Sequence, residues 1–195
     1  MLNKLFTHIT LLINYLFWNC LFKKFDYGAR VSLFANITGY NNIKIGRYSR
    51  IMSGVIVNSI NGTITIGRNT IINEYTVIKP TKRQVVIGDN CSIQQFCKII
   101  GGIRIGNYTR IASGCAISAF NHEYINKSVF IRLQGIIYKD IKLGNDVWIG
   151  SNVSILNGVQ IEDGVVIGAN SLINKDISSF SVVAGNPFKV IKKRV

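Results

Sequence analysis

Histidine is the side chain whose ordinary pKa best suits proton transfer near neutral pH, and the chain contains only two, His8 and His122. His122 stands in the stretch AISAFNHEYINKSVF, residues 116–130. A positioned imidazole can take the proton from a hydroxyl group while that hydroxyl attacks an electrophile. The same side chain can also serve as an ordinary hydrogen-bonding residue of a loop, so its surroundings must decide. His8 lies in an apolar segment, which favours a structural or interfacial role.

The number of histidines argues against a zinc site that is built from three histidine ligands. The part of the chain after residue 26 contains one histidine, His122. Four cysteines in 195 residues, without a cleavable signal sequence, are typical of reduced thiols in the cytoplasm. We therefore expect a cytoplasmic protein without a metal.

A six-residue repeat dominates the chain from residue 45 onward. An aliphatic residue recurs at every sixth position from Leu143 to Ile173, and the segments IGRYSR, IGRNTI, IGDNCS and IGNYTR begin at residues 45, 66, 87 and 105. Those starts are 21, 21 and 18 residues apart. Three six-residue faces per turn, with three additional residues in two of the turns, produce this spacing. The pattern predicts one all-β domain, a triangular parallel solenoid whose stacked coils bury the aliphatic residues together.

Other positions of the repeat also have a structural meaning. The glycine after the aliphatic residue and the Asn-rich third and fourth positions should supply the positive φ angles that sharp corners need. The fifth position should carry a small side chain that faces the interior, which would explain three of the four cysteines. The residues at this position are Ser49, Thr70, Cys91, Cys97, Thr109, Cys115, Val147, Val153 and Ser171.

The repeat is interrupted once, after Ile117. The next aliphatic residue in phase is expected at position 123, yet the regular pattern returns only at Leu143, so a loop spanning about 122–142 is predicted to leave the solenoid. Loops fixed to a rigid scaffold commonly carry catalytic and binding residues. His122 stands at the root of this loop, which would hold its side chain at a fixed point.

Both ends of the chain differ from the repeat. Residues 1–26 form an apolar segment that favours a helix and ends in lysines, and residues 179–195 form a basic C-terminal tail, which leaves 27–178 for the solenoid. An apolar helix with a basic end suits the surface of an anionic membrane, here the inner face of the cytoplasmic membrane. Packing of residues 1–25 against the solenoid end or a partner chain is the alternative. A membrane span is disfavoured because polar residues interrupt the segment.

The formal net charge is +14, which calls for an anionic partner or a solvated basic surface. Nucleic acid is the usual first hypothesis for such a charge. The basic residues are nevertheless scattered through the repeat, with one cluster in FKVIKKRV at residues 188–195, and no nucleic-acid motif is recognisable. Nucleic acid is therefore disfavoured, and a polyphosphate-bearing cofactor or an anionic lipid explains the charge at least as well.

From about residue 30 to residue 195 the chain resembles the hexapeptide-repeat acyltransferases. The sequence NHEY before the loop, LGNDVWIGSNVSILNGVQIEDGVVIGANSLINKDI after it and VVAGNPFKVIKK near the end are very similar to the xenobiotic, galactoside and maltose O-acetyltransferase group. They are most like the sugar O-acetyltransferases of bacterial surface-polysaccharide clusters. The resemblance implies a left-handed parallel β-helix, acetyl-CoA as co-substrate, and homotrimers with active sites between subunits.

The resemblance also implies roles for individual residues on the acceptor side. His122 would deprotonate the acceptor hydroxyl, which would attack acetyl-CoA directly, without an acyl-enzyme. Asn121 or Glu123 would orient the imidazole or the sugar, and Gln94 would hold the acceptor. Trp148 would line both the acceptor site and the pantetheine site, although an indole at this position can also simply pack against the loop.

On the coenzyme side the resemblance implies contacts from backbone and side chains. The amides of Ser151 and Ala169 would bind the pantetheine arm, and that of Ser151 would also stabilise the developing oxyanion. Asn174, Lys189 and Lys192 would lie near the adenine and the phosphates of coenzyme A. For the two lysines, a solvated basic tail is the alternative.

Two departures from the group bear on the acceptor. Sugar acetyltransferases that act on simple glycosides carry an acidic pair where this chain has Gly101 and Gly102, and the apolar segment stands in place of their helical N-terminal domain. A membrane-proximal glycan is therefore favoured, such as a precursor of a capsule, an O-antigen or an exopolysaccharide. The alternatives are an N-acetyltransferase acting on an amino sugar and a non-catalytic β-solenoid scaffold.

Overall fold

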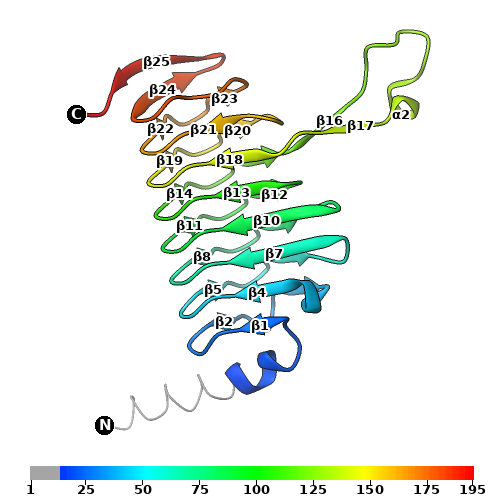
Figure 1. Cartoon of the computed structure of the whole chain (residues 1–195), viewed down its shortest axis with the longest axis vertical. Helices are drawn as coiled ribbons and strands as arrows, with labels where there is room; N and C mark the ends of the chain where they lie inside the picture. Colours follow the sequence, from blue (N-terminus) through cyan, green and yellow to red (C-terminus); the bar gives the residue numbers. More distant parts are fainter. Residues whose placement is uncertain (1–13) are drawn as a thin grey trace.

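The computed structural model describes residues 14–195, which form a parallel β-solenoid with three long faces (Figure 1). The first face contains β1 (Lys24–Phe25), β4 (Ile43–Ile45), β7 (Gly62–Ile66), β10 (Arg83–Ile87), β13 (Ile103–Ile105), β18 (Ile141–Leu143) and β21 (Gln160–Ile161). The second face contains β2 (Arg30–Val31), β5 (Arg50–Ile51), β8 (Ile71–Ile72), β11 (Ser92–Ile93), β14 (Arg110–Ile111), β19 (Trp148–Ile149), β22 (Val166–Ile167), β24 (Ser181–Gly185) and β25 (Phe188–Lys193). The third face contains β3 (Asn36–Thr38), β6 (Ile56–Asn58), β9 (Val77–Lys79), β12 (Lys98–Ile100), β15 (Ala116–Ser118), β20 (Ser154–Ile155) and β23 (Leu172–Ile173). A short 3-10 turn, η1 (Tyr40–Asn42), precedes β4.

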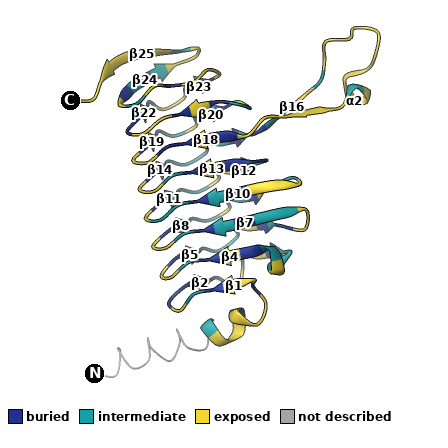
Figure 2. Ribbon diagram, viewed as in Figure 1, coloured by how far each residue is buried: buried dark blue, intermediate teal, exposed yellow. Residues whose placement is uncertain are grey.

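The pairing register reproduces the spacing of the repeat and confirms the predicted all-β parallel solenoid. Ile45 pairs with Ile66, Ile66 with Ile87, and Ile87 with Ile105, all at the first position of their coils. Ile105 then pairs with Leu143 across the interruption. Because side chains alternate along a strand, this register turns every first-position residue toward the interior, where all five are buried. Figure 2 shows the buried segments following the strands of successive coils.

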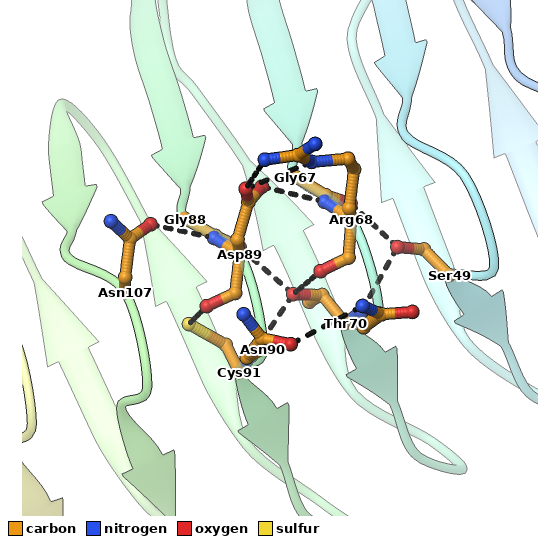
Figure 3. Close-up of polar contacts among 10 residues, drawn as sticks. Ser49, Gly67, Arg68, Thr70, Gly88, Asp89, Asn90, Cys91 and Asn107 are labelled. Carbon is orange, nitrogen blue, oxygen red and sulfur yellow. Dashed lines mark hydrogen bonds and ion pairs between the residues drawn. The ribbon is translucent and has the colours of Figure 1, made fainter.

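The small residues of the fifth position are all buried, as predicted. Apart from Ser171, which donates within its own coil, their polar groups also donate to backbone carbonyls of the next coil. The Ser49 hydroxyl donates to the carbonyl of Gly67 at 2.5 Å, and the Thr70 hydroxyl donates to that of Gly88 at 2.8 Å (Figure 3). A small polar side chain is favoured here because buried carbonyls need a donor.

The glycines after the aliphatic residues have a different role from the predicted one. Positive φ occurs at the fourth position, for example at Asn69 and Asn90, and neither these glycines nor the third-position residues have it. An added Cβ at Gly67 would stand 2.6 Å from the carbonyl carbon of Gly88 in the next coil. The prediction is therefore right for the fourth position and wrong for the other two. Glycine is needed because the backbones of neighbouring coils approach closely there.

Side-chain oxygens link successive coils at the corner between the first and second faces (Figure 3). Asp89 Oδ1 accepts a hydrogen bond from the Arg68 N–H at 2.7 Å, and Asn107 Oδ1 accepts one from the Asp89 N–H at 2.8 Å. Asn145 and Asp163 continue the series at 2.9 and 2.6 Å. The backbone N–H and the guanidinium of Arg68 together hold the pKa of the Asp89 carboxyl below its usual range.

The segment that interrupts the repeat is an antiparallel hairpin, residues 120–138, called the arm below. β16 (Phe120–His122) pairs with β17 (Ile136–Tyr138), and α2 (Ile131–Gln134) lies toward its tip. Figure 1 shows the arm projecting away from the side of the solenoid. The solenoid resumes at β18, because Ile141 is buried and pairs with Ile103, so the interruption ends slightly earlier than the predicted 142.

The N-terminal part that the structure describes closes the end of the solenoid. Residues 14–19 are helical, and Trp18 and Phe22 are buried with their ring centroids 6.2 and 5.2 Å from that of Tyr40. β1 already belongs to the first face, so the solenoid begins before the predicted residue 27. Within residues 14–195 no helix combines the length and the apolar character that a membrane span requires. The roles predicted for residues 1–13 lie outside the described residues.

The C-terminal residues form a hairpin on the second face, where the sequence predicted a tail. β24 pairs in parallel with β22, which places Val183 over Ile167 and buries it, and β25 returns antiparallel to β24. The Lys193 ammonium donates to the Ser179 carbonyl at 2.7 Å. The hairpin forms because one more aliphatic position extends the core.

Candidate active site

His122 lies at the end of β16, at the base of the arm, and its side chain is exposed. It pairs with Ile136 of β17. The Phe120 ring stands edge-on to the imidazole with the centroids 6.3 Å apart, and Phe120 is also 6.3 Å from the Tyr138 ring. Strand pairing and aromatic contacts therefore fix His122, while its imidazole has no hydrogen bond to another residue that the structure describes.

The neighbours of His122 make contacts of a different kind from those predicted. Asn121 Oδ1 accepts a hydrogen bond from the backbone N–H of His122 at 3.0 Å, so it holds the strand rather than the ring. The backbone N–H of Glu123 donates to the Gly135 carbonyl at 3.1 Å, which closes the hairpin. A role for either side chain in orienting the imidazole or the sugar stays a prediction.

Trp148 lies on the outer side of the second face and is 57% exposed. The register stacks Arg110, Trp148, Val166, Val182 and Lys192 in one column across β14, β19, β22, β24 and β25. Three strand spacings of about 4.8 Å separate Trp148 from Lys192, about 14 Å in total. An extended ligand along this column would reach from the indole to a cationic side chain.

Ser151 and Ala169 occupy the third position of two successive coils, at the corner between the second and third faces. The Ser151 carbonyl accepts a hydrogen bond from the Asn170 N–H at 2.8 Å, which holds the two coils in register. In residues 14–195 the backbone N–H groups of Ser151 and Ala169 have no acceptor. At the first–second corner the Asp or Asn side chain of the next coil accepts a hydrogen bond from the corresponding amide, whereas the next-coil residues here are Ala169 and Gly185, which have no side-chain acceptor. These two amides are therefore open to a ligand.

The remaining coenzyme-side candidates divide between two places. Lys189 and Lys192 lie exposed on β25, and Lys189 pairs with Ala184 directly above Gly168. Lys189 thus continues the corner that carries Ser151 and Ala169, while Lys192 continues the column of Trp148. This corner and the adjacent column are together called the edge below. Asn174 follows β23 on the third face, away from that edge.

Gln94 lies at the same corner as Ser151, two coils earlier in the chain. Its backbone carbonyl accepts a hydrogen bond from the Thr76 hydroxyl at 3.0 Å, and the neighbouring Gln95 accepts one from Ser113 at 3.1 Å. The Gln94 side chain has no partner among the described residues. In this chain Gln94 therefore lies with the Ser151 corner and not with His122.

One chain does not bring all these residues together. Ala116 of β15 pairs with Ser154, three residues after Ser151. His122 lies six residues beyond Ala116, and six residues of extended chain span about 20 Å at ~3.3 Å each. Trp148, Ser151 and the two lysines thus share one edge, while His122 stands across the third face from them.

A contact that was not predicted from the sequence fastens the arm to the solenoid. Arg83 Nη1 donates to Asp140 Oδ1 at 3.0 Å, and the Arg83 guanidinium lies 5.7 Å from the centre of the Tyr138 ring. The Asp140 carboxyl also occupies the space that a side chain at Gly102 would need. The register of β10, β13 and β18 pairs Ile87 with Ile105 and Ile105 with Leu143, and continuing it across the interruption would have revealed that Arg83 and Asp140 are neighbours. No group of three or more His, Cys, Asp or Glu side chains suited to a metal ion occurs in residues 14–195.

Comparisons with known proteins agree with the repeat architecture. The family model described as bacterial transferase hexapeptide (six repeats) matches residues 84–119 and 140–175, on either side of the arm. The solved structure of AntD, an N-acyltransferase from Bacillus cereus in complex with dTDP and 3-hydroxybutyryl-CoA, superposes with a TM-score of 0.64 at 21% identity and covers 91% of this chain and 86% of that one. At this identity the likeness concerns the fold alone.

Curated relatives carry acetyltransferase names. The putative lipopolysaccharide biosynthesis O-acetyl transferase WbbJ of Escherichia coli K12 is 32% identical over 142 residues, 68% of this chain and 72% of that protein. A probable macrolide acetyltransferase of Lysinibacillus sphaericus is 38% identical over 112 residues, 55% of this chain and 62% of that protein. The chain spans about half the length of several other such relatives, for example 52% of a chloramphenicol acetyltransferase of Klebsiella aerogenes. The repeat, its register and these matches together show that the chain belongs to the bacterial hexapeptide-repeat transferase family.

Proposed function

We propose that the protein is an acetyl-CoA-dependent O-acetyltransferase that acts on a sugar hydroxyl of a bacterial surface polysaccharide or its precursor. The observation that carries the proposal is the edge formed by Trp148, the open amides of Ser151 and Ala169, and Lys192, together with the exposed His122 on the arm. The edge offers an extended thioester ligand an indole, backbone donors and a cation in sequence. The name of the WbbJ relative supports the choice of a surface glycan as acceptor.

The chemistry is a direct transfer. The His122 imidazole takes the proton of the sugar hydroxyl as the hydroxyl oxygen bonds to the acetyl carbon. The N–H of Ser151 donates to the oxygen that becomes negative at this carbon. The carbon–sulfur bond then breaks, the ester remains on the sugar, and the imidazolium returns its proton to the departing thiolate of coenzyme A. Lys189 and Lys192 hold the coenzyme phosphates by charge, and Asn174 and Gln94 are further contacts in this proposal.

The proposal includes an assembly. Because His122 and the Ser151 edge are separated within one chain, the complete site forms between the arm of one chain and the edge of another, in a homotrimer of left-handed solenoids. We place the enzyme in the cytoplasm. Leu16 and Phe17, which are exposed, together with the exposed Lys23 and Lys24, are the described part of a surface for the inner face of the membrane.

Thiol release from acetyl-CoA, measured with a panel of lipid-linked and nucleotide-activated sugars, tests the proposal. We expect acceptor-dependent release that falls by roughly 10²–10⁴-fold in His122→Ala, the range for loss of a general base. Lys127→Ala, which changes an exposed residue of the same arm, is the matched control and should retain activity. Equal rates in His122→Ala and the unchanged protein would remove the proposed role of His122, and absence of both coenzyme A binding and turnover would favour the scaffold alternative.

A further inference from the structure

A groove lies on the outer side of the first face, at the base of the arm. It has a volume of about 340 Å³ and crosses β10, β13, β18 and β21, which Figure 1 shows side by side. Its polar lining is formed by Arg83, Gln84, Arg104, Asp140, Lys142 and Gln160. The edge with Trp148 and Ser151 lies on another part of the solenoid, so the function proposed above leaves this groove without a role.

Two cations in the groove have no counter-ion within residues 14–195. Arg104 and Lys142 are directly opposite each other in the register of β13 and β18, and both are exposed. Like charges at opposite positions of neighbouring strands repel each other. The one carboxylate in the groove, Asp140, is held by Arg83, and none of the ion pairs of residues 14–195 involves Arg104 or Lys142. An anion between them would relieve the repulsion.

The other groups in the groove suit a sugar. The Gln160 amide donates to the Asp140 carbonyl at 3.3 Å, which leaves its own carbonyl oxygen as an acceptor, and the Gln84 side chain is exposed. Amide side chains donate to and accept from hydroxyl groups. Together with the two cations, they form a lining suited to a ligand that carries hydroxyl groups as well as negative charge.

The groove is connected to His122 through side-chain contacts. The Arg83 guanidinium lies over the Tyr138 ring, the Tyr138 ring is 6.3 Å from that of Phe120, and the Phe120 ring is 6.3 Å from the imidazole. His122 lies two strand positions beyond Phe120, about 7 Å along β16. A ligand in the groove would therefore continue toward the base of the arm.

Two hollows next to the groove differ in charge, and this difference would orient an anionic ligand along the first face. On the N-terminal side a hollow shares Gln84 and Val86 with the groove and adds Lys23 and Lys44. On the C-terminal side a hollow shares Lys142 and Gln160 and is lined by Glu162 and Asp163. Hydrogen bonds from Ser179 hold the pKa of the Glu162 carboxyl below its usual range, so this end stays negative at neutral pH. An anionic chain would extend toward Lys44 and be repelled at the other end.

We propose that this groove binds an acidic sugar residue of the acceptor, so that the glycan that is acetylated carries carboxylates. The inference deepens the proposed function and rests on it in one respect, namely that the bound sugar belongs to the acceptor. Cations repeated along an elongated hollow favour a saccharide chain with several carboxylates over a single diphosphate group, which would occupy only one end.

Direct binding tests the groove without requiring turnover. Titration calorimetry on the intact oligomer would compare oligogalacturonate with a neutral maltooligosaccharide of the same length. We expect the acidic glycan to bind more tightly, with an affinity that falls as salt rises. The double variant Arg104→Gln/Lys142→Gln should weaken acidic binding by about tenfold or more, because it removes both unpaired cations. The matched control, Arg50→Gln/Lys98→Gln, removes two exposed cations from the other faces and should bind like the unchanged protein.

The outcomes separate the groove from the enzyme. Equal affinity for the two glycans, or an unchanged affinity in the Arg104/Lys142 double variant, would overturn the inference even if acetyl transfer to neutral sugars is found. A nucleoside diphosphate that binds more tightly than oligogalacturonate and loses affinity in the same variant would also overturn it, in favour of a phosphate site. Acidic binding that depends on Arg104 and Lys142, without any acetyl transfer, would support the groove and count against the proposed function.

Discussion

Arg83 and Asp140 join two parts of the chain that are 57 residues apart, through a 3.0 Å hydrogen bond between Nη1 and Oδ1 at the base of the arm. The side chains are 41% and 59% exposed, so the ion pair adds at most about 1 kcal/mol to the stability of the fold. Its importance is local, because it fixes the direction in which the arm, and with it His122, leaves the solenoid.

Replacing Asp140 by Asn should therefore loosen the arm with little effect on global stability. We expect the free energy of unfolding to change by less than about 1 kcal/mol, while trypsin cleaves after Lys127 or Arg132 several-fold faster. Mass spectrometry of timed digests measures the cleavage, with Arg50→Gln as the control for a lost surface charge. Unchanged cleavage in Asp140→Asn would contradict the role of the ion pair.

Asp89 makes a pH-dependent contribution to the stability of the fold, and substitutions can isolate it. The pKa of Asp89 is lowered in the folded protein. Its contribution to stability is therefore fully present above the pKa of an unfolded chain, about 3.9, and is lost as the pH falls through the pKa of the folded protein. Asp89→Asn should keep the bond to the Arg68 N–H, as Asn107 and Asn145 do for their neighbours, yet lose this acid dependence. Asp89→Ala should cost about 0.5–1.5 kcal/mol at neutral pH. Thermal unfolding between about pH 3 and pH 7 distinguishes the variants. Identical pH profiles for Asp89→Asn and the unchanged protein would contradict the role of the Asp89 carboxyl.

Gly67→Ala should destabilise the solenoid by roughly 2–4 kcal/mol, because the new methyl group would meet the backbone of Gly88. Gly135→Ala is the matched control. Gly135 has a φ of 102°, but an added Cβ would meet no atom of the described residues within 4 Å, so only local backbone strain remains. Chemical denaturation measures both variants. A Gly67→Ala protein as stable as Gly135→Ala would contradict the close-approach explanation.

In the folded protein one of the four thiols should react with a thiol reagent much faster than the other three. Cys20 is exposed, while Cys91, Cys97 and Cys115 are buried, and burial raises the pKa of the Cys91 thiol. We expect one thiol to react with Ellman's reagent in the folded protein and the other three only after unfolding. Cys20→Ser should abolish the fast reaction. Fast reaction of a second thiol would mean that the fifth-position side chains are not packed as described.

The sequence predicted the solenoid well because its repeat is set by local rules. The spacing of Ile45, Ile66, Ile87 and Ile105 is the pairing register itself, and small fifth-position residues must face inward whatever the rest of the chain does. The role of Gly67 was misassigned because the close approach of Gly88 depends on how the coils stack. The C-terminal hairpin was missed for a similar reason, since its basic residues conceal one further aliphatic position.

The candidate site was less accessible from the sequence. Trp148 and Ser151 could be assigned to one edge because both belong to the regular repeat. The base of the arm depends on a contact between Arg83 and Asp140, which lie two coils apart, and the register between those coils continues only after the interruption. The separation of His122 from Ser151 likewise becomes evident only when the third face and the arm are seen together.

In the proposed mechanism His122 of one chain acts with Trp148 and Ser151 of another, and subunit mixing tests this arrangement. His122→Ala and Trp148→Ala proteins would be assayed separately, then unfolded together, refolded as mixed oligomers and assayed for acceptor-dependent thiol release. If each site is shared by two chains, about a quarter of the sites in an equal random mixture contain both intact residues. We predict recovery to about that fraction of the unchanged activity. Mixed oligomers confirmed by mass spectrometry that stay as inactive as the two parents would contradict the account.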